Sequence, residues 1–243
     1  MNRPATLIGL MGLSLMSLTA CNTSVKFDGI DEPELPQRIT IDTNFKDGEQ
    51  GWVAGFSDYP IADSEIYELV AEIAPLPNDE SVSGFRVSGH NRSDDLFMYL
   101  KLKADNLAPN TRYILSGTVT FLSNAGRNCT GIGGAPGESV FFKLGASELE
   151  PEQVDYYMNV DKGNQSTSGN DALTIGNVAT DGASCTDETT FDEKTLELEA
   201  SESFEIQSSE DGHLWLFFGT DSGFEGLTNL YYTNVALSLT PSD

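Results

Sequence analysis

The chain has 243 residues, of which 38 are acidic and 13 basic, so its formal net charge at pH 7 is −25. This length allows one large core, and all-β domains of 200–250 residues are common. The charge argues against nucleic acid or anionic lipid headgroups as partners, because phosphate binding needs clustered Lys and Arg side chains.

The first twenty residues have the pattern of a secretory signal peptide. Arg3 supplies a short basic start, residues 7–18 are almost wholly apolar, and small residues precede Cys21. The apolar run is too short to cross a bilayer as a retained helix. Leu18-Thr19-Ala20-Cys21 resembles the lipobox of bacterial lipoproteins. That resemblance implies cleavage before Cys21 and attachment of lipid to its sulfur and its new amino group; an ordinary signal peptide cut near Ala20 is the alternative.

The lipobox resemblance also implies a location and an anchor. We expect a lipid-anchored protein of the bacterial cell envelope that faces away from the cytoplasm, with a membrane as one partner. Beyond residue 20 no apolar run approaches a membrane span, so the lipid is the only anchor expected. Asn22 differs from the Asp that marks inner-membrane retention, which favours the outer membrane if the cell has two.

Residues 21–37 are predicted to form a flexible tether after the lipidated cysteine. The stretch contains Pro33, Pro36 and four acids but little apolar material. Residues 38–243 show neither an internal repeat nor a second linker, so we expect a single domain there.

Cys129 and Cys185 remain as an isolated pair in an oxidising compartment, which predicts a disulfide between them. Two free thiols are the alternative. A metal site is not favoured, because neither cysteine has another Cys or a His close in sequence.

The dominant period from Arg38 onward is two, which is typical of half-buried strands. Apolar and polar residues alternate in five segments: 85–88, 98–103, 113–121, 196–199 and 235–239. Residues 214–218 are apolar on both faces and predict a central strand with Trp215 in the core. Residues 65–74 fit a helix or a strand and are assigned to a strand. Turn-rich segments separate the strands, so we expect an all-β, two-sheet sandwich of the jelly-roll kind.

Both ends of this predicted domain carry a family resemblance. The opening of galactose-binding-like jelly rolls is similar to Asn44-Phe45-Lys46-Asp47-Gly48 followed by Gly51-Trp52. Segment 107–113 is similar to the stretch that leads into a core strand of these folds, and segment 230–237 is similar to their last strand. These folds include many carbohydrate-binding modules, so the resemblance implies a galactose-binding-like sandwich and glycan recognition. Segments 88–95 and 159–166 resemble those of bacterial lipoproteins without an assigned activity.

The sequence differs from the pattern of these modules at a calcium site. Many such modules place Glu and Asp where this chain has Lys46 and Thr233. An ammonium and a hydroxyl cannot replace two carboxylates as ligands of Ca²⁺. Asp42, Asp47 and Asp58 lie near in sequence and could rebuild a site, so Ca²⁺ stays an open expectation and the metal ligands are unknown.

Acidic residues are concentrated late in the chain. Residues 181–211 hold eleven carboxylates and one base, Lys194. A solvated acidic face and divalent-cation binding are the two interpretations.

Two polar loops are the candidate ligand-binding segments. One supplies His90, Asn91, Arg92, Asp94 and Asp95; the other supplies Asp161, Asn164 and Gln165. These groups suit hydrogen bonding to sugar hydroxyls or to a carboxylate. The alternative is internally satisfied loops, with Arg92 paired to Asp94 or Asp95.

Aromatic side chains in loops would stack beneath a sugar. Trp52 either takes this role or plugs the end of the sandwich, and Phe56, Tyr59, Tyr156 and Tyr157 are further candidates.

No catalytic motif stands out. The chain has only two histidines and lacks both a G-x-S-x-G elbow and an H-E-x-x-H helix. Carboxylate pairs for glycoside hydrolysis cannot be singled out among 38 acids. We therefore expect non-catalytic recognition of a glycan or similar polar ligand. The alternatives are a structural or protein-interaction lipoprotein with an envelope-protein partner, and an enzyme acting on polysaccharide.

Overall fold

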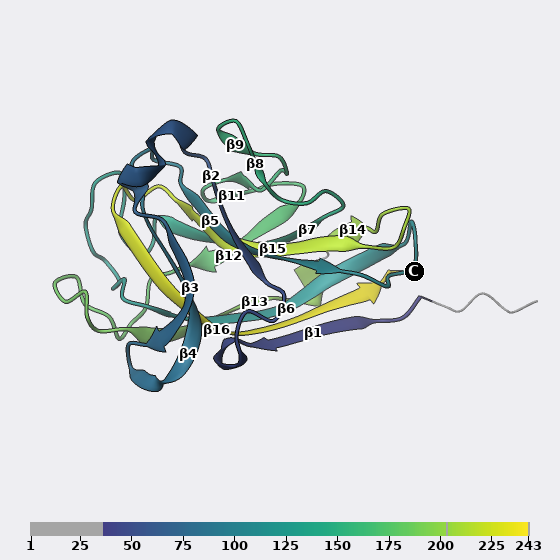
Figure 1. The fold of residues 1–243 in the computed structure, drawn as a ribbon, viewed down its shortest axis with the longest axis horizontal. Helices are drawn as coiled ribbons and strands as arrows, with labels where there is room; N and C mark the ends of the chain where they lie inside the picture. The colour runs from purple at the N-terminus through teal and green to yellow at the C-terminus, as the bar shows by residue number, and fades with distance from the viewer. Residues whose placement is uncertain (1–35, 203, 243) are drawn as a thin grey trace, which may run out of the picture. The chain divides into compact units, whose positions relative to one another are not determined.

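The structure is a computed structural model that describes residues 36–202 and 204–242. Within them most of the chain forms antiparallel strands in two facing sheets (Figure 1). The predicted signal peptide, Cys21 and the tether up to residue 35 lie outside the described residues. No helix in the described part is long and apolar enough to cross a membrane.

One sheet has seven strands in the described chain. Its main order is β13-β6-β16-β4-β3, and β1 also pairs with β16 and β14 with β6. The strands are β1 (Ile39–Asn44), β3 (Val70–Leu76), β4 (Asp79–His90), β6 (Arg112–Ser123), β13 (Asp192–Leu198), β14 (Glu205–Gln207) and β16 (Leu227–Pro241).

The facing sheet has five strands in the order β12-β7-β15-β5-β2. They are β2 (Val53–Ser57), β5 (Phe97–Ala104), β7 (Val140–Ser147), β12 (Ala172–Asn177) and β15 (Leu214–Ser222). The chain crosses repeatedly between the sheets, for example from β4 to β5, β6 and β7, which is the connectivity of a jelly roll. The predicted two-sheet sandwich is confirmed.

The segment 65–74 is only partly the strand that was predicted. A 3₁₀ helix, η2 (Ile61–Tyr67), occupies its first residues, and β3 begins at Val70. Glu68, at the end of η2, has a left-handed φ of 52°, so the chain turns there before it becomes extended. Two further 3₁₀ helices are η1 (Phe45–Asp47) and η3 (Ala200–Glu202).

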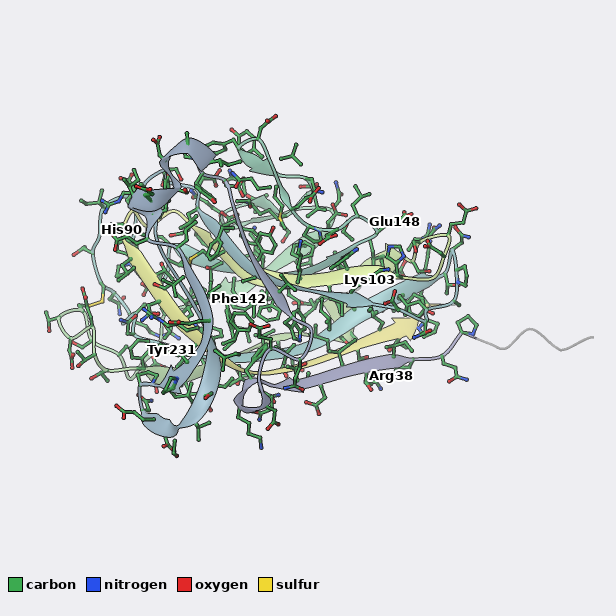
Figure 2. All side chains as sticks on the ribbon, viewed as in Figure 1. Arg38, His90, Lys103, Phe142, Glu148 and Tyr231 are labelled. Carbon is green, nitrogen blue, oxygen red and sulfur yellow. A yellow bond between two sulfur atoms is a disulfide. The ribbon has the colours of Figure 1, made fainter. Side chains whose placement is uncertain are left out.

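The core lies between the sheets, where Phe142 is seen in Figure 2. Alternation along β15 directs Leu214, Leu216 and Phe218 into it. Trp215 faces the other way and is partly exposed, with Lys101 Nζ 5.6 Å from its ring centroid. The prediction that Trp215 belongs to the core is wrong, because successive side chains of a strand point to opposite faces.

The predicted disulfide is confirmed. Cys129 and Cys185 are bonded, with their Cα atoms 5.4 Å apart. The bond joins the loop between β6 and β7 to the loop between β12 and β13.

The sandwich has two distinct ends, which we call the His90 end and the Arg38 end. His90 pairs with Leu227 at the start of β16, whereas Ile39 pairs with Leu239 near its finish. At about 3.3 Å per residue, these two places are roughly 40 Å apart. Figure 2 shows His90 and Arg38 at opposite ends of the molecule.

Candidate functional site

The outer face of the five-stranded sheet is covered by the chain itself. Residues 148–171, which we call the covering loop, connect β7 to β12 and contain two short hairpins. These are β8 (Gln153–Val154) with β9 (Tyr157–Met158), and β10 (Gly163–Asn164) with β11 (Thr167–Ser168). Met158 and Val160 pack on Phe97, Tyr99 and Phe217, forming a second buried apolar cluster outside the main core.

A buried group of charges lies beneath the covering loop. Lys162 Nζ is 2.9 Å from Asp221 Oδ2 and 3.5 Å from Asp58 Oδ2. Lys143 Nζ is 3.9 Å from Asp221 Oδ2 and donates a hydrogen bond to the backbone oxygen of Thr167. All four charged side chains are almost completely buried. Because such charges are costly to bury unless they are paired, the group holds the covering loop against the sheet.

The pKa values of these groups follow from burial and pairing. Burial lowers the pKa of Lys143 to about 8, although Asp221 opposes the change. Burial also acts to lower the pKa of Lys162, but Asp221 and Asp58 outweigh it and raise this pKa above its usual value. Burial raises the pKa of Asp58, in opposition to Lys162. Lys162 therefore stays charged at neutral pH between two acidic partners.

A turn in the covering loop brings its backbone to the same carboxylate. Gly163 has a φ of 75°, and a Cβ there would collide with the backbone oxygen of Thr167. Only glycine suits this position. The turn allows the backbone N–H of Gln165 to donate to Asp221 Oδ2 at 2.8 Å.

A cleft of about 140 Å³ opens beside this group at the His90 end. Asp58 and Asp95 line it on one side, and residues 157–158 and 160–164 line it on the other. Asp95 Oδ1 is buried and accepts no hydrogen bond from the described residues. Burial raises the pKa of Asp95 to about 6; Lys162 opposes the rise, while Asp221, Asp58 and Asp94 add to it. The cleft thus contains an acceptor that lacks a donor.

Tyr157 is the aromatic side chain that lines the cleft. Tyr157 is 64% exposed, and its ring packs edge to face on the ring of Tyr156 with the two ring centroids 4.8 Å apart. The backbone oxygen of Tyr156 accepts from the N–H of Asp58, which ties this hairpin to the end of β2. Tyr157 is therefore largely exposed on a hairpin that is attached to the sheet.

The two predicted loops meet at this cleft. Gln165 Nε2 donates to the backbone oxygen of Asp94 at 3.0 Å. Asp95 lines the cleft from one loop, and Asn164 and Asp161 line it from the other.

Two predicted ligand-binding side chains, Asn91 and Trp52, are buried. Asn91 is 1% exposed, and its amide nitrogen donates to the backbone oxygens of Ser222 and Phe224 at 2.7 and 3.0 Å. It holds the loop before β5 to the turn after β15. Trp52 is also 1% exposed; its indole N–H donates to Thr43 Oγ1, and its ring lies 4.9 Å from that of Phe218. It plugs the core instead of stacking on a ligand.

His90 and Arg92 lie away from the cleft, beside the end of η2. Arg92 Nε donates to the backbone oxygen of Ile66 at 3.2 Å, and its guanidinium is 3.6 Å from Glu68 Oε1. The same guanidinium is 3.2 Å from His90 Nδ1. Arg92 is therefore paired, but with neither Asp94 nor Asp95.

Asp161 serves mainly as a turn residue. Its carboxylate accepts hydrogen bonds from the backbone N–H groups of Asn170 and Gly163 and from the Asn170 side chain. The bond from the Asn170 backbone is the main cause that lowers the pKa of Asp161. One wall of the cleft is thus preorganised before any ligand arrives.

Sequence reasoning missed the buried charges. Lys162 stood inside a predicted loop, and Lys143 and Asp221 stood beside or within strands, where burial is not visible in a local pattern. A lysine between Phe142 and Leu144 is the one signal that could have marked a paired charge on the sheet.

Asp58, one of the three acids that could rebuild a calcium site, is paired with Lys162, whose Nζ is 3.5 Å from Asp58 Oδ2. In residues 36–202 and 204–242, no three His, Cys, Asp or Glu side chains are grouped closely enough to hold a metal ion.

The fold and cleft define an antiparallel β-sandwich whose loops form a polar hollow at one end. No protein-family model and no curated protein sequence matches this chain. It is similar to a carbohydrate-binding module, CBM27-1 of Caldicellulosiruptor saccharolyticus in complex with mannohexaose, at 11% identity and a TM-score of 0.37. That match covers 84% of this chain and 98% of the other.

Two other similar structures are of different kinds. The K1 adhesin domain of Lys-gingipain from Porphyromonas gingivalis has 14% identity and a TM-score of 0.38, with 82% and 97% of the two chains covered. The tailspike protein 4 domain of bacteriophage CBA120 has 11% identity and a TM-score of 0.36; the match covers 78% of this chain but only 19% of the tailspike chain. At such values the likeness does not extend to any site.

Proposed function

We propose that this protein is a non-catalytic, lipid-anchored lipoprotein of the bacterial cell envelope that recognises a glycan through the cleft between Asp58, Asp95 and the covering loop. The observation that carries the proposal is the pairing of an exposed ring, Tyr157, with the unpartnered carboxylate oxygen of Asp95 in one hollow. A pyranose has an apolar face that stacks on an aromatic ring and hydroxyl groups that donate to carboxylates. The proposal rests on this cleft and not on weak overall similarity to carbohydrate-binding modules.

The resemblance of residues 18–21 to a lipobox supports the anchored part of the proposal. The described chain begins at the Arg38 end, and the cleft lies at the His90 end (Figure 2). Metabolic labelling with a fatty acid, lost on Cys21→Ala, tests the anchor.

The glycan proposal is tested by applying the full chain, purified in detergent, to a broad glycan array in calcium and again in chelator. We expect selective binding in both buffers, because the Asp58 carboxylate of the cleft is already paired with the ammonium of Lys162. Tyr157→Ala should weaken the affinity about tenfold, equivalent to about 1.4 kcal/mol. Asp95→Asn should weaken it by a similar factor.

Two matched variants serve as controls. Leu149→Ala removes an exposed apolar side chain from the same loop outside the cleft, and Asp94→Asn removes an exposed carboxylate next to Asp95. Both should leave glycan affinity within about twofold. Equal affinity in all four variants would refute the cleft as the site. A blank array would favour an envelope protein as the partner, and release of sugar products would favour an enzyme.

A further inference from the structure

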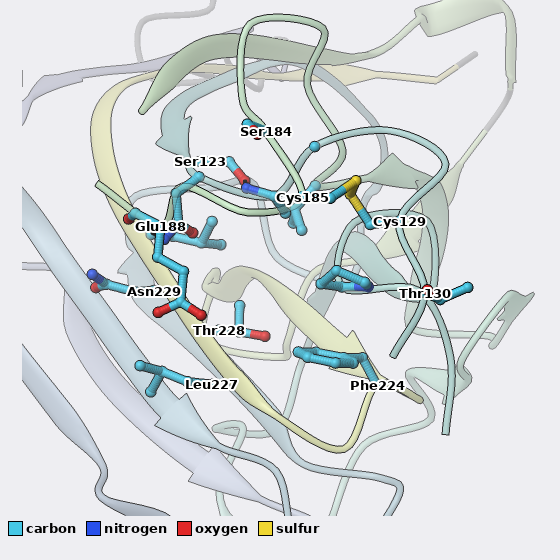
Figure 3. A pocket seen from close by; sticks show the side chains of 16 residues that line it. Ser123, Cys129, Thr130, Ser184, Cys185, Glu188, Phe224, Leu227, Thr228 and Asn229 are labelled. Atoms are coloured by element: carbon cyan, nitrogen blue, oxygen red, sulfur yellow. Dashed lines mark hydrogen bonds between the residues drawn. A yellow bond between two sulfur atoms is a disulfide. The ribbon is translucent and has the colours of Figure 1, made fainter. Parts of the chain in front are cut away.

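A second hollow lies at the His90 end, next to the disulfide. It has a volume of about 210 Å³, below the roughly 300–1,000 Å³ of pockets for drug-sized ligands, so it suits one ring or one side chain. Cys129 and Cys185 form one wall, and Phe224 and Leu227 form another (Figure 3). This pocket and the glycan cleft have no lining residue in common.

The pocket contains a buried hydroxyl without a partner. Thr228 is 6% exposed, lines the pocket, and its Oγ1 forms no hydrogen bond within the described chain. A buried hydroxyl that lacks a partner destabilises the folded chain, so it marks a place where a hydrogen bond from a ligand would be stabilising.

The one charged side chain among the described residues that line the pocket is a carboxylate, Glu188. Figure 3 shows it extending across the pocket toward Thr228 and Asn229, with the Phe224 ring on the other side. It belongs to the acidic segment 181–211, which has eleven carboxylates against one lysine. The pocket therefore favours a positive charge.

The hydrogen-bonding groups that line the pocket favour a ligand that donates hydrogen bonds. The Glu188 carboxylate only accepts hydrogen bonds, and Thr228 Oγ1 can accept them too. Asn124 donates its amide N–H to the backbone oxygen of Glu188, and its amide oxygen has no partner in the described chain. A primary ammonium has three donors and no acceptor, and an aromatic face such as that of Phe224 attracts a cation.

We propose that this pocket binds a primary ammonium group carried on a short apolar stem. Glu188 and Thr228 receive the ammonium, and Phe224, Leu227 and the disulfide contact the stem. Such a group occurs on free alkylamines and on the lysine side chains of proteins, and the pocket recognises the chemistry that these two share.

The test is a titration of the ¹⁵N-labelled full chain in detergent, followed by amide chemical shifts. The probes are n-butylammonium and an acetylated, amidated Gly-Lys-Gly peptide, with 1-butanol and the corresponding Gly-Met-Gly peptide as neutral comparisons. We expect saturable shifts at Thr228 and Phe224 with both ammonium probes and no saturation with the neutral ones. Tighter binding of the lysine peptide would identify a protein side chain as the source, and tighter binding of butylammonium would identify a free amine.

Variants separate the pocket from the general negative charge. Glu188→Gln should weaken ammonium binding about tenfold and Thr228→Val about fivefold, through loss of a charged and a neutral hydrogen bond. Glu197→Gln makes the same change in net charge on exposed β13 and should have less than a twofold effect. Equal losses in Glu188→Gln and Glu197→Gln, or saturable binding of 1-butanol, would overturn the proposal. Glycan affinity should be unchanged in Glu188→Gln, so the ammonium proposal and the glycan proposal are tested independently.

Discussion

The carboxyl of Asp95 illustrates how one residue is held in an unfavourable state at a binding cleft. Its Oδ1 is buried without a donor, and burial raises its pKa to about 6. Groups with such perturbed pKa values in a cleft are commonly functional, because folding alone gains nothing from them. A ligand hydroxyl would supply the missing donor.

We predict that Asp95→Asn stabilises the folded chain at pH 8 by about 1 kcal/mol, a value reduced from the full pKa shift to allow for partial exposure. The raised pKa means that the folded state binds the proton more tightly than the unfolded state. The stability that Asp95 contributes is therefore complete below about pH 4 and is lost as the pH rises through 6. Urea unfolding at pH 4 and pH 8 measures this difference. Asp94→Asn is the control, and an equal gain from Asp95→Asn at both pH values would contradict the assignment.

At the scale of elements, the covering loop shields the outer face of the five-stranded sheet from solvent. Without the covering loop, the sheet face that contains Phe97, Tyr99 and Phe217 would be exposed. The apolar cluster and the buried charges together attach the loop to this face. Because the loop also supplies Tyr157 and Asn164, attachment and ligand binding depend on the same segment.

Lys162→Met should destabilise the chain by about 3 kcal/mol, because it leaves Asp58 and Asp221 buried without the ammonium between them. Amide hydrogen exchange should speed up at Gln165 and Asp58, whose N–H groups bond across this contact. Lys103→Met, which removes an exposed lysine from the same sheet face, should change stability by less than about 1 kcal/mol. Similar effects of the two variants would show that the buried charges do not attach the loop.

The disulfide constrains two loops at the His90 end that otherwise meet through an isolated β-bridge between Gly126 and Thr180. Cys129→Ala with Cys185→Ala should lower the free energy of unfolding by about 4 kcal/mol, since the closed loop spans a separation of 56 residues. Guanidinium unfolding of the double variant measures the loss, and the reduced native chain should show the same value. A loss below about 1 kcal/mol would mean that strand pairing already restrains these loops.

At the scale of the whole molecule, the net charge of −25 acts against the compact state. Like charges repel when the chain is folded, and dissolved salt screens that repulsion. The screening length falls from about 30 Å in 0.01 M salt to about 3 Å in 1 M salt.

We therefore predict that the midpoint of thermal unfolding rises as NaCl is increased from 0.01 to 1 M. A variant with Glu193→Lys and Glu197→Lys, two exposed positions on β13, should show a smaller rise because it carries less net charge. Differential scanning calorimetry of both chains provides the comparison. A midpoint that falls with salt would show that surface ion pairs outweigh the repulsion.

Local patterns were sufficient to predict most of the sandwich. Alternation in segments such as 98–103 and 113–121 predicted β5 and β6, since side chains two residues apart share a face of a strand. The pairing of Cys129 with Cys185 followed from cysteine count and compartment. The two polar loops were recognisable from composition, because ligand groups gather where strands end.

The tertiary structure alone decided which of those groups can reach a ligand. Alternation shows that Trp215 and Phe217 share a face but not that the covering loop buries Phe217 and leaves Trp215 partly open. Asn91 was a plausible ligand residue until its amide was found bonded to the turn after β15. Lys162, Asp58 and Asp221 come from distant parts of the chain, and whether a charge is buried depends on long-range packing that no local sequence pattern contains.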